Sequence, residues 1–414
     1  MHTKLSLPVN LNDRAIILDI LRGFAILGIL IDNLTGFTGY SYFTTAQKQA
    51  LPTFYADNFL NTCELIFVRG KFYSMFSLLF GIGFSIILAR HSENGTHSLK
   101  LFYRRLLVLL IIATVHITLI WEGDILFLYA VLGLALPLFR NCANRTLLIW
   151  AAALLLSPLV IDFVKVLFNF RLASFLENLA FSIDKKNGIP LDDTFSTYLF
   201  KEGSGWQEWR NWLQSGWIYR FSFLIESNRI PKVFGMFLLG FYAGKNLIYA
   251  NLDAHLPLFK TIRKWGFSVG IPFSIVMAYF EYDGYFVPEK LGLLDTLCYT
   301  FSVVPLSLAY VSAICLFWIK VKGNGRLNYL APVGRMALTN YLMHSVICIG
   351  LCYGVGLGWG GKIGPSLYFP LALCLYTVQM IISNWWFKHF AYGPIEWLWR
   401  QLTYGKKLTL RKEV

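Results

Sequence analysis

Long apolar runs separated by short polar segments follow one another from residue 15 to residue 387. Each run is about 20 residues long, which is the length of helix that crosses the hydrocarbon core of a bilayer. We place about ten such spans, at residues 15–34, 71–90, 102–121, 123–140, 146–168, 233–250, 265–281, 292–319, 335–355 and 366–387. The pattern predicts an all-α polytopic membrane protein with a single membrane domain over residues 1–414, the first five helices in 1–168 and the last five in 233–414.

Lys and Arg residues are concentrated in alternate loops. Arg104 and Arg105 lie near the start of one span, and the basic segment 260–264 precedes another. The intervening short loops, such as 121–124 and 281–284, carry acidic residues instead. Because short cytoplasmic loops are enriched in Lys and Arg, this asymmetry predicts an even number of spans with both termini in the cytoplasm.

The longest loop, residues 169–232, falls on the predicted extracytoplasmic side. It carries Trp206, Trp209 and Trp212 at intervals of three residues. Such a stripe is typical of a helix at the membrane surface, where indole rings occupy the headgroup region. We expect an interfacial anchor, and the alternative is that these rings line a sugar or lipid acceptor site.

Composition agrees with a membrane protein and narrows the range of partners. Hydrophobic residues make up 56% of the 414 residues and charged residues 14%, whereas a soluble domain carries about 25% charged residues. The net charge of +14 comes from loops in which Lys and Arg contact anionic lipid, so we expect membrane lipids as partners and no nucleic acid. The seven cysteines form no C-x-x-C pair, and neither a metal site nor a disulfide framework is predicted.

Asp19 and Arg22 lie inside the first span. A charged side chain at the centre of a membrane helix costs about 2.5–3.5 kcal/mol on insertion scales, and it faces a bundle interior or a wet cavity. Residues three apart share a helix face, so these two charges can partly neutralise each other. The pair indicates a functional site or, alternatively, an ion pair that only joins two helices.

Polar residues of the spans fall into two groups according to their depth. The outer group is Asp32, Asn33, Arg69, Lys71, His116, Glu122 and Asp124. The inner group is Asp19, Arg22, Arg104, Arg105, Arg335 and Asn340, with His344 near mid-membrane. Arg22 and Asn33 are 11 residues apart, which is about 16 Å along a helix and about half of the hydrocarbon thickness. The first span therefore connects the two groups.

Five motifs are spread over nearly the whole chain. They are Leu18-Asp19-Ile20-Leu21-Arg22-Gly23-Phe24-Ala25, Phe76-Ser77-Leu78-Leu79-Phe80-Gly81, His116 with Gly123-Asp124-Ile125-Leu126, Gly334-Arg335-Met336-Ala337-Leu338-Thr339-Asn340-Tyr341, and Tyr392-Gly393-Pro394-Ile395-Glu396-Trp397-Leu398-Trp399-Arg400. Together they resemble the YeiB family of bacterial membrane proteins. The resemblance implies a multi-pass protein of the bacterial cytoplasmic (inner) membrane.

The first motif is also similar, at longer range, to transmembrane acyltransferases, including the heparan-glucosaminide acetyltransferases and the acyltransferase-3 group. The shared element is L-D-x-x-R-G followed, after ten intervening residues, by a polar residue. That residue is His in acyltransferase-3 proteins and Asn33 here, as in the heparan-glucosaminide branch. That branch places its catalytic His in the following loop, whereas residues 35–60 of this chain contain no His. A base in this chain would therefore lie elsewhere.

This resemblance and the two depth groups predict an acyltransferase. An acyl group, for example acetyl, would pass from cytoplasmic acyl-CoA to an extracytoplasmic hydroxyl or amine on a small molecule, a glycan or a lipid. His116 is the predicted base, and Glu122 or Asp124 would orient it. The expected substrate-binding residues are Asp19, Arg22, Arg69, Lys71, Arg335, Asn340 and His344.

Within this scheme, Asn33 and Arg69 would stabilise the oxyanion that forms on the thioester carbon. Arg22 and Arg335 would bind the phosphates of coenzyme A, because the guanidinium fork matches phosphate geometry. No nucleophile elbow is predicted, so the sequence does not indicate a serine nucleophile.

Two other functions stay open. A transporter or exporter of a small polar or anionic solute would use the same buried charges as a permeation path, although the chain shows no inverted repeat. A non-catalytic relative would be a scaffold for other membrane proteins, and the sequence leaves an oligomer open. In that case His116 and His344 would only hydrogen-bond neighbouring helices, and Asp124 would only cap the span that it begins.

Overall fold

The computed structural model describes residues 16–92, 98–192, 194–200, 203, 205–280, 290–323 and 325–412. Regular structure in these residues is helical, apart from one isolated β-bridge between Phe390 and Arg411, and the all-α fold class is confirmed. The α-helices are α1 (Ile16–Phe37), α2 (Thr45–Gln49), α3 (Phe54–Phe67), α4 (Lys71–Ser92), α5 (Ser98–Leu119), α6 (Leu126–Gly133), α7 (Asn144–Phe168), α8 (Ser174–Asn187), α9 (Phe195–Tyr198), α10 (Trp206–Glu226), α11 (Arg229–Lys245), α12 (Leu256–Phe280), α13 (Lys290–Lys320), α14 (Leu330–Arg335), α15 (Ala337–Cys352), α16 (Pro365–His389) and α17 (Pro394–Tyr404). Short 3-10 helices are η2 (Tyr40–Tyr42), η3 (Leu136–Phe139), η4 (Asp253–His255) and η5 (Arg326–Tyr329). The predicted acidic loop 281–284 lies outside the described residues.

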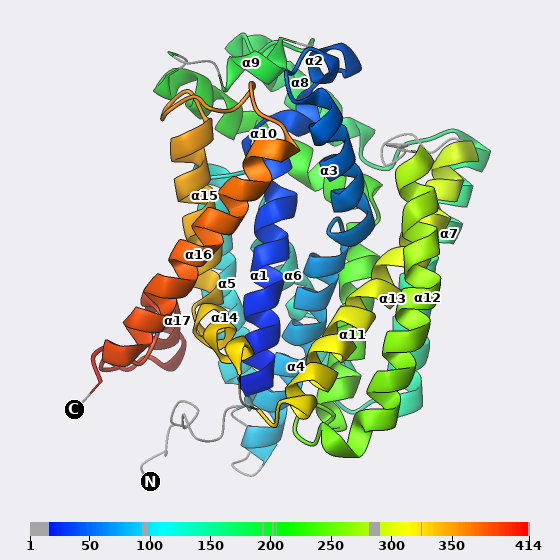
Figure 1. The fold of residues 1–414 in the computed structure, drawn as a ribbon, viewed down its shortest axis with the longest axis vertical. Helices are drawn as coiled ribbons and strands as arrows, with labels where there is room; N and C mark the ends of the chain where they lie inside the picture. Colours follow the sequence, from blue (N-terminus) through cyan, green and yellow to red (C-terminus); the bar gives the residue numbers. More distant parts are fainter. Residues whose placement is uncertain are drawn as a thin grey trace.

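Helix α1 runs through the middle of the bundle from one end to the other (Figure 1). Its side chains Ile20, Leu30 and Leu34 are completely buried, because a helix that is apolar on all sides is covered by other helices. Helices α4, α14, α15 and α16 pack directly against it. We call the end of the bundle with the start of α1 and with α17 the α17 end, and the end with α2 and α8 the α8 end.

Five helical segments of the described chain are long and apolar enough to cross a membrane, namely Phe54–Ala89, Leu99–Leu119, Asn144–Phe168, Gly292–Lys320 and Pro365–His389. Helix α7 also exposes large apolar side chains, including Ile149, Val160 and Leu167. A row of exposed apolar side chains of this kind is typical of a surface that contacts lipid. The chain is therefore a membrane protein, whereas the number of about ten spans and the cytoplasmic position of both termini stay predictions.

One of the predicted spans is a broken helix. Residues 123–140 form α6, which ends at Gly133, followed by η3. The break precedes Pro137, which has no backbone N–H to donate to the preceding turn, and the single long helix predicted there is wrong. The span predicted at residues 335–355 is shorter in the structure, because Met336 separates the short α14 from α15, which is continuous over Ala337–Cys352.

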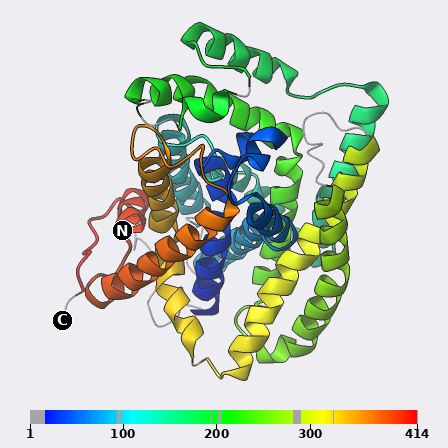
Figure 2. The same cartoon turned by 45° about the horizontal axis from the view of Figure 1, so that its top comes forward.

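Residues 169–232 form α8, α9 and α10, which lie across the α8 end, and also the first turn of α11 (Figure 2). The side chain of Trp206 is 62% exposed, whereas Trp212 is buried. The Trp212 ring stacks on Tyr219, with 5.8 Å between the ring centroids. The tryptophan stripe is therefore divided between the surface and the core, and the interfacial role of the whole loop stays a prediction.

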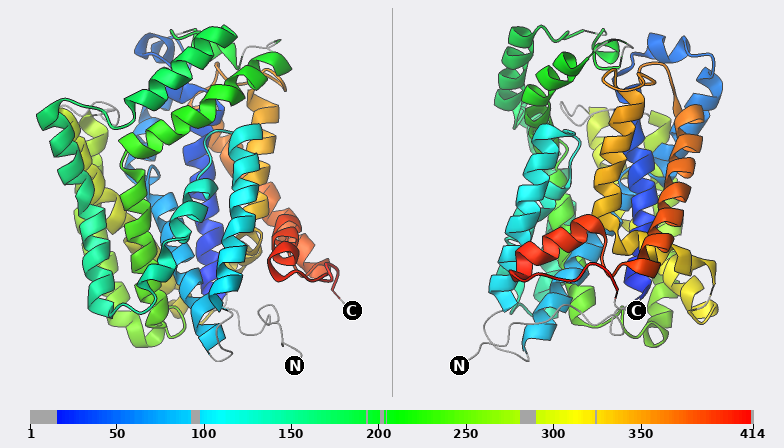
Figure 3. Two further views of the ribbon diagram at one scale, coloured as in Figure 1. Left: turned by 180° about the vertical axis from the view of Figure 1, so that it is seen from behind. Right: turned by 90° about the vertical axis from the view of Figure 1, so that its left-hand side faces the viewer.

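Helix α17 lies across the α17 end rather than along the bundle (Figure 3). Its Leu398 and Leu402 side chains are exposed, and Thr403 is buried. This division is typical of an amphipathic helix at a membrane surface. The indole Nε1 of Trp399 donates a hydrogen bond to the carbonyl oxygen of Arg105 (2.8 Å), which ties α17 to α5.

Candidate functional site

A cavity of about 290 Å³ lies at the α17 end, between α1, α4, α5, α14 and α17. Most of its wall is apolar. The polar lining residues are Asp19, Arg22, Arg105, Tyr129, Tyr249, Arg335, Tyr341, Glu396 and Arg400. The structure thus brings the predicted residues Asp19, Arg22 and Arg335 together, while their part in substrate binding stays a prediction.

Four arginine side chains line this cavity. Arg22 Nη1 lies 2.8 Å from Asp19 Oδ1. The guanidinium carbons of Arg105 and Arg335 lie over aromatic rings, 4.2 Å and 3.9 Å from the ring centroids. Stacking fixes the plane of a guanidinium, and its N–H fork matches the geometry of a phosphate or carboxylate. The cavity wall is therefore suited to an anionic ligand.

The carboxylate of Glu396, a residue that also lines the cavity, caps the start of α15. It accepts hydrogen bonds from the backbone N–H groups of Leu338 (2.8 Å) and Thr339 (3.0 Å) and from the Thr339 hydroxyl (2.6 Å). The first N–H groups of a helix have no partner inside the helix, so a carboxylate at this position stabilises the helix start. Burial raises the pKa of Glu396 above its usual range, against the effect of these hydrogen bonds.

Helices α1 and α14 cross at two glycines. A Cβ atom on Gly334 would lie 1.8 Å from the carbonyl oxygen of Asp19, and one on Gly23 would lie 2.3 Å from the carbonyl oxygen of Leu330. Only residues without a side chain permit backbones to approach this closely. Arg22 precedes Gly23, and Arg335 follows Gly334. The crossing therefore places both arginines on the wall of one cavity.

His116 is hydrogen-bonded at both ring nitrogens. Its Nδ1 lies 2.7 Å from Asp124 Oδ2, and its Nε2 lies 2.9 Å from the hydroxyl oxygen of Ser345. All three residues are at most 1% exposed. With an ionised Asp124, the proton of a neutral imidazole sits on Nδ1, and Nε2 accepts from the Ser345 hydroxyl. The arrangement is that of a general base oriented by a carboxylate.

The turn between α5 and α6 places Asp124 beside His116. The carbonyl oxygen of His116 accepts a hydrogen bond from the N–H of Trp121 (2.8 Å), and the Trp121 ring stacks on Phe37 of α1 with 4.0 Å between centroids. Asp124 Oδ1 accepts a hydrogen bond from the N–H of Phe127 (2.7 Å). The carboxylate therefore caps α6 with one oxygen and bonds His116 with the other.

Tyr341 links the cavity wall to His116. It is among the residues that line the cavity, whereas His116, Ser345 and Asn33 are not. Its ring centroid is 5.5 Å from the centroid of the His116 ring. Ser345 follows Tyr341 by four residues, which is about one helical turn along α15. On α1, Ile29 lines the cavity, and Asn33 occupies the same helix face one turn later. Ile29 and Tyr341 therefore place the cavity wall about one helical turn from Asn33 and Ser345.

Asp124, rather than Glu122, is the carboxylate that bonds His116. The Glu122 side chain lies beside α10, because its Cβ is 3.2 Å from where a Cβ on Gly216 would be. Helix α10 also contributes Arg220, whose Nε donates to the carbonyl oxygen of Asp124 (3.0 Å). Sequence reasoning missed Arg220, since nothing in the pattern of α10 relates it to the α5–α6 turn.

Arg69 and Lys71 lie at the break between α3 and α4. Lys71 is completely buried, and its Nζ donates to the carbonyl oxygen of Leu65 (2.7 Å). Arg69 interacts electrostatically with the buried carboxylate of Glu64, which accepts a hydrogen bond from the Tyr368 hydroxyl (2.7 Å). Lys71 interacts electrostatically with Asp32 and Arg69, and Asp32 also interacts with Glu64. The two cations therefore belong to one cluster with Asp32 and Glu64, and their predicted roles in substrate binding stay predictions.

Asn340 and His344 connect α15 to α16. The Asn340 amide Nδ2 lies 3.3 Å from the Ser383 hydroxyl oxygen, and His344 Nε2 lies 2.7 Å from Gln379 Oε1. Both side chains are buried, and neither is among the residues that line the cavity. The contacts favour the alternative in which these residues join neighbouring helices.

Sequence reasoning also missed Ser345 as a partner of His116, because 229 positions separate the two residues. A different serine lies in a Gly-x-Ser-x-Gly pattern at residues 266–270, inside α12. A Cβ on Gly266 would lie 2.6 Å from the carbonyl oxygen of Pro305 in α13. The pattern there provides close helix packing and is not a nucleophile turn.

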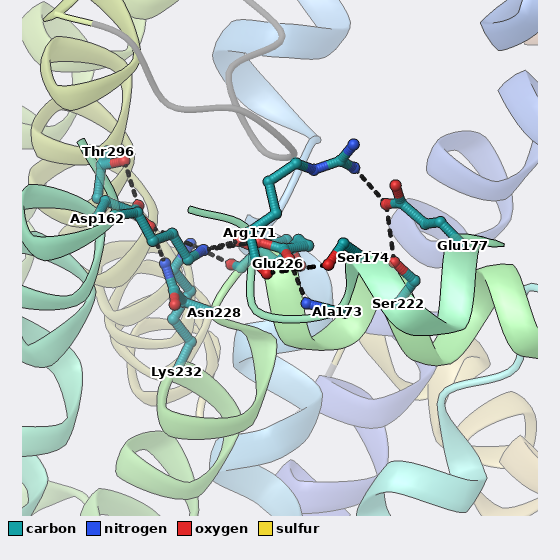
Figure 4. Close-up of polar contacts among 12 residues, drawn as sticks. Asp162, Arg171, Ala173, Ser174, Glu177, Ser222, Glu226, Asn228, Lys232 and Thr296 are labelled. Carbon is teal, nitrogen blue, oxygen red and sulfur yellow. Dashed lines mark hydrogen bonds and ion pairs between the residues drawn. The ribbon is translucent and has the colours of Figure 1, made fainter. Parts of the chain in front are cut away.

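A second buried polar cluster joins α7, α10, α11 and α13 (Figure 4). Lys165 Nζ lies 3.1 Å from Asp162 Oδ1 and 3.1 Å from Glu226 Oε2. Asp162 also accepts hydrogen bonds from Asn228 Nδ2 and from the Thr296 hydroxyl, both 2.7 Å. Lys232 also interacts electrostatically with Asp162 and supplies a second positive charge beside the two carboxylates. The cluster is therefore suited to fixing the junction of α10 and α11.

Comparisons with other proteins place the chain among bacterial relatives. The family model "Protein of unknown function (DUF418)" matches residues 243–406. The uncharacterised protein YxaH of Bacillus subtilis (strain 168) is 32% identical over 96% of this chain and 96% of its own length. The uncharacterised protein YeiB of Escherichia coli (strain K12) is 28% identical over 94% of this chain and 96% of its own length. No solved structure matches the chain.

Proposed function

The chain belongs to the bacterial family of YxaH and YeiB, and for this member we propose transfer of an acyl group from cytoplasmic acyl-CoA to an extracytoplasmic hydroxyl or amine. The acceptor is a small molecule, a glycan or a lipid. One observation carries the proposal: an arginine-lined cavity includes Tyr341, whose ring centroid is 5.5 Å from that of a buried histidine oriented by a carboxylate. These are the two parts that a thioester-dependent transfer requires.

The α17 end is the donor side in this proposal. Arg22, Arg105, Arg335 and Arg400 line the cavity there, and arginine binds phosphate through two parallel hydrogen bonds. A volume of about 290 Å³ is at the lower limit of small-molecule pockets. It suits the pantetheine arm and the acyl group, with the nucleotide of coenzyme A bound by arginines at the mouth.

His116 is the base. With its Nδ1 proton held by Asp124, Nε2 takes a proton from the attacking group in the transition state. Asn33, on the cavity-facing side of α1, supplies an amide donor to the oxyanion of the thioester carbon. In this scheme the protein spans the inner membrane about ten times, the α17 end faces the cytoplasm, and the acceptor approaches from the α8 end.

Binding of radiolabelled acetyl-CoA to purified protein tests the donor side. We expect saturable binding that weakens about 10–100-fold in Arg105→Gln or Arg335→Gln, the loss expected for a hydrogen bond between charged groups. Arg263→Gln, in an exposed basic segment outside the cavity, is the matched control and keeps wild-type affinity. His116→Ala retains binding and loses transfer.

Absence of acetyl-CoA and longer acyl-CoA binding by the folded wild type would overturn the proposal. If the same preparation moved a polar anion into liposomes, the buried charges would instead form a permeation path, and the transporter alternative would be favoured. A protein with neither activity would fit a scaffold.

A further inference from the structure

We propose that Ser345 is a nucleophile and that the acyl group is carried on it as a covalent ester. The proposal uses the acyl-CoA donor of the proposed function and adds an intermediate to it. Ser345, His116 and Asp124 come from α15, α5 and the α5–α6 turn, and their hydrogen bonds form one continuous chain of 2.9 Å and 2.7 Å. A serine, a histidine and a carboxylate joined in this order form an activated nucleophile on many unrelated folds.

Some buried helical serines of this chain bond other helices, as Ser222 does with Glu177 and Ser383 with Asn340, but Ser345 bonds an imidazole nitrogen. Others bond only their own helix. Ser74 donates to the carbonyl oxygen of Gly70 (2.9 Å), and Ser302 lies 3.3 Å from that of Tyr299. Such bonds to the preceding turn are the ordinary way for a serine inside an apolar helix to satisfy its hydroxyl. Ser345 is directed instead to the imidazole nitrogen that can remove its proton.

The position of Ser345 suits a thioester that enters from the α17 end. Tyr341 lines the cavity one turn earlier on the same helix, and its ring centroid is 5.5 Å from that of His116. Because Ser345 and His116 are each 1% exposed, the proposal requires a side chain of the cavity wall, such as Tyr341, to move before the acyl carbon reaches Ser345. The burial also excludes water, which would otherwise hydrolyse an acyl ester.

The reaction then has two balanced halves. In the first, Ser345 Oγ bonds to the acyl carbon, the carbon–sulfur bond breaks, and the hydroxyl proton passes through His116 Nε2 to the sulfur, so that coenzyme A leaves as a thiol. In the second, the acceptor hydroxyl or amine attacks the acyl-serine carbon, and its proton passes through Nε2 back to Ser345 Oγ. Asp124 remains ionised throughout.

A covalent intermediate allows the two substrates to bind in turn. Donor and acceptor approach from opposite ends of the bundle in the proposed function, and only one of them needs to occupy the site at a time. The expected kinetics are ping-pong, with a first half-reaction that proceeds without any acceptor.

The test combines two probes on the full-length protein. Without acceptor, acetyl-CoA is expected to release about one equivalent of coenzyme A per protein in a burst, and peptide mass spectrometry locates the acetyl group on Ser345. A fluorophosphonate, which labels activated serines whatever their natural donor, is expected to label the same peptide. Both labels are lost in Ser345→Ala and His116→Ala, whereas Ser302→Ala, a buried serine of α13, keeps them.

A cysteine variant distinguishes loss of the nucleophile from a folding defect. Ser345→Cys is expected to take up acetyl as a thioester that neutral hydroxylamine removes, whereas the ester of the wild type resists it. Size-exclusion profiles of all variants in detergent show whether they fold.

Each result separates the two proposals. Fluorophosphonate labelling of Ser345 without acetylation by acetyl-CoA supports the nucleophile and contradicts the donor. Acetyl transfer at the wild-type rate by Ser345→Ala, or an active wild type with no label on Ser345, overturns the nucleophile and leaves direct transfer by His116. Absence of both labels from a folded wild type also overturns it.

Discussion

Asp124 contacts two different partners with its two carboxylate oxygens. Oδ1 accepts from the N–H of Phe127 at the start of α6, and Oδ2 bonds His116 Nδ1. Asparagine and aspartate cap helices about equally well, but they present different atoms to an imidazole, since an amide carries a donor as well as an acceptor. A substitution of Asp124 can therefore separate an effect on protein stability from an effect on the protonation of His116.

Asp124→Asn is expected to keep the melting temperature close to that of the wild type, because the amide oxygen still accepts from Phe127. Acetyl transfer should fall about 10³–10⁴-fold, because the amide favours the wrong tautomer of His116. Thermal unfolding in detergent and release of coenzyme A measure the two effects.

The control is Asp192→Asn, in an exposed turn where the carboxylate accepts from Thr194, and it should change neither quantity. Wild-type turnover in folded Asp124→Asn protein would show that Asp124 serves only as a helix cap.

At the scale of elements, the crossing of α1 and α14 shapes the arginine-lined cavity. The two backbones meet at Gly23 and Gly334, and the flanking Arg22 and Arg335 reach the same space. The close approach that these two glycines permit therefore affects the position of both arginines.

Gly334→Ala is expected to destabilise the protein by about 1–3 kcal/mol, the usual cost of overpacking, because the new Cβ would meet the Asp19 carbonyl oxygen at 1.8 Å. Separation of the two helices also moves Arg335 away from Arg22, so acetyl-CoA binding should weaken. Chemical unfolding and radioligand binding measure both effects.

Gly350→Ala is the matched control, since it is also a helical glycine, and a Cβ there meets nothing within 4 Å. It should be neutral or slightly stabilising, because alanine favours a helix. Equal behaviour of the two variants would show that the crossing tolerates a methyl group.

Several features of the elements could be predicted from the sequence. Apolar runs of membrane-spanning length predict α4, α5, α7, α13 and α16, because a bilayer imposes that length. The break before η3 accompanies Pro137 and has a signal in the sequence, whereas the break between α14 and α15 could not be predicted, since it depends on contacts with other elements. Glu396, for example, caps the start of α15 from a position 57 residues after Thr339.

The candidate site also combines contacts that could be predicted from the sequence with contacts that could not. Asp19 and Arg22 are three residues apart on one helix, so their ion pair could be predicted from spacing and is confirmed at 2.8 Å. His116, near the end of α5, and Asp124, in the turn that follows, are eight residues apart and could be associated from sequence. Ser345 could not, because its approach to His116 depends on how α15 packs beside α5.

For the whole molecule, the orientation in the membrane decides which substrate reaches which end. The start of α1 and α17 lie at one end (Figure 1), and the predicted cytoplasmic loops carry most of the Lys and Arg residues. Both observations favour a cytoplasmic α17 end, because positive loops stay inside.

Single cysteines in a protein without its seven native cysteines test this orientation. A membrane-impermeant maleimide is expected to label Lys407→Cys only in inside-out vesicles, and Leu191→Cys only in right-side-out vesicles, because both positions are exposed and lie beyond opposite ends of the bundle. Labelling of both from the same side would contradict the orientation, and it would reverse the assignment of one substrate entrance.

The ring of Tyr341 has a further consequence for the cell. Bacteria store energy as a proton-motive force, and an uninterrupted column of water through a membrane protein would discharge it. Tyr341 lines the cavity, and its ring centroid is 5.5 Å from that of His116. If the proposed function is correct, a column of water that joined the two substrate entrances would pass this ring, and the bulk of the ring would keep the bilayer electrically tight.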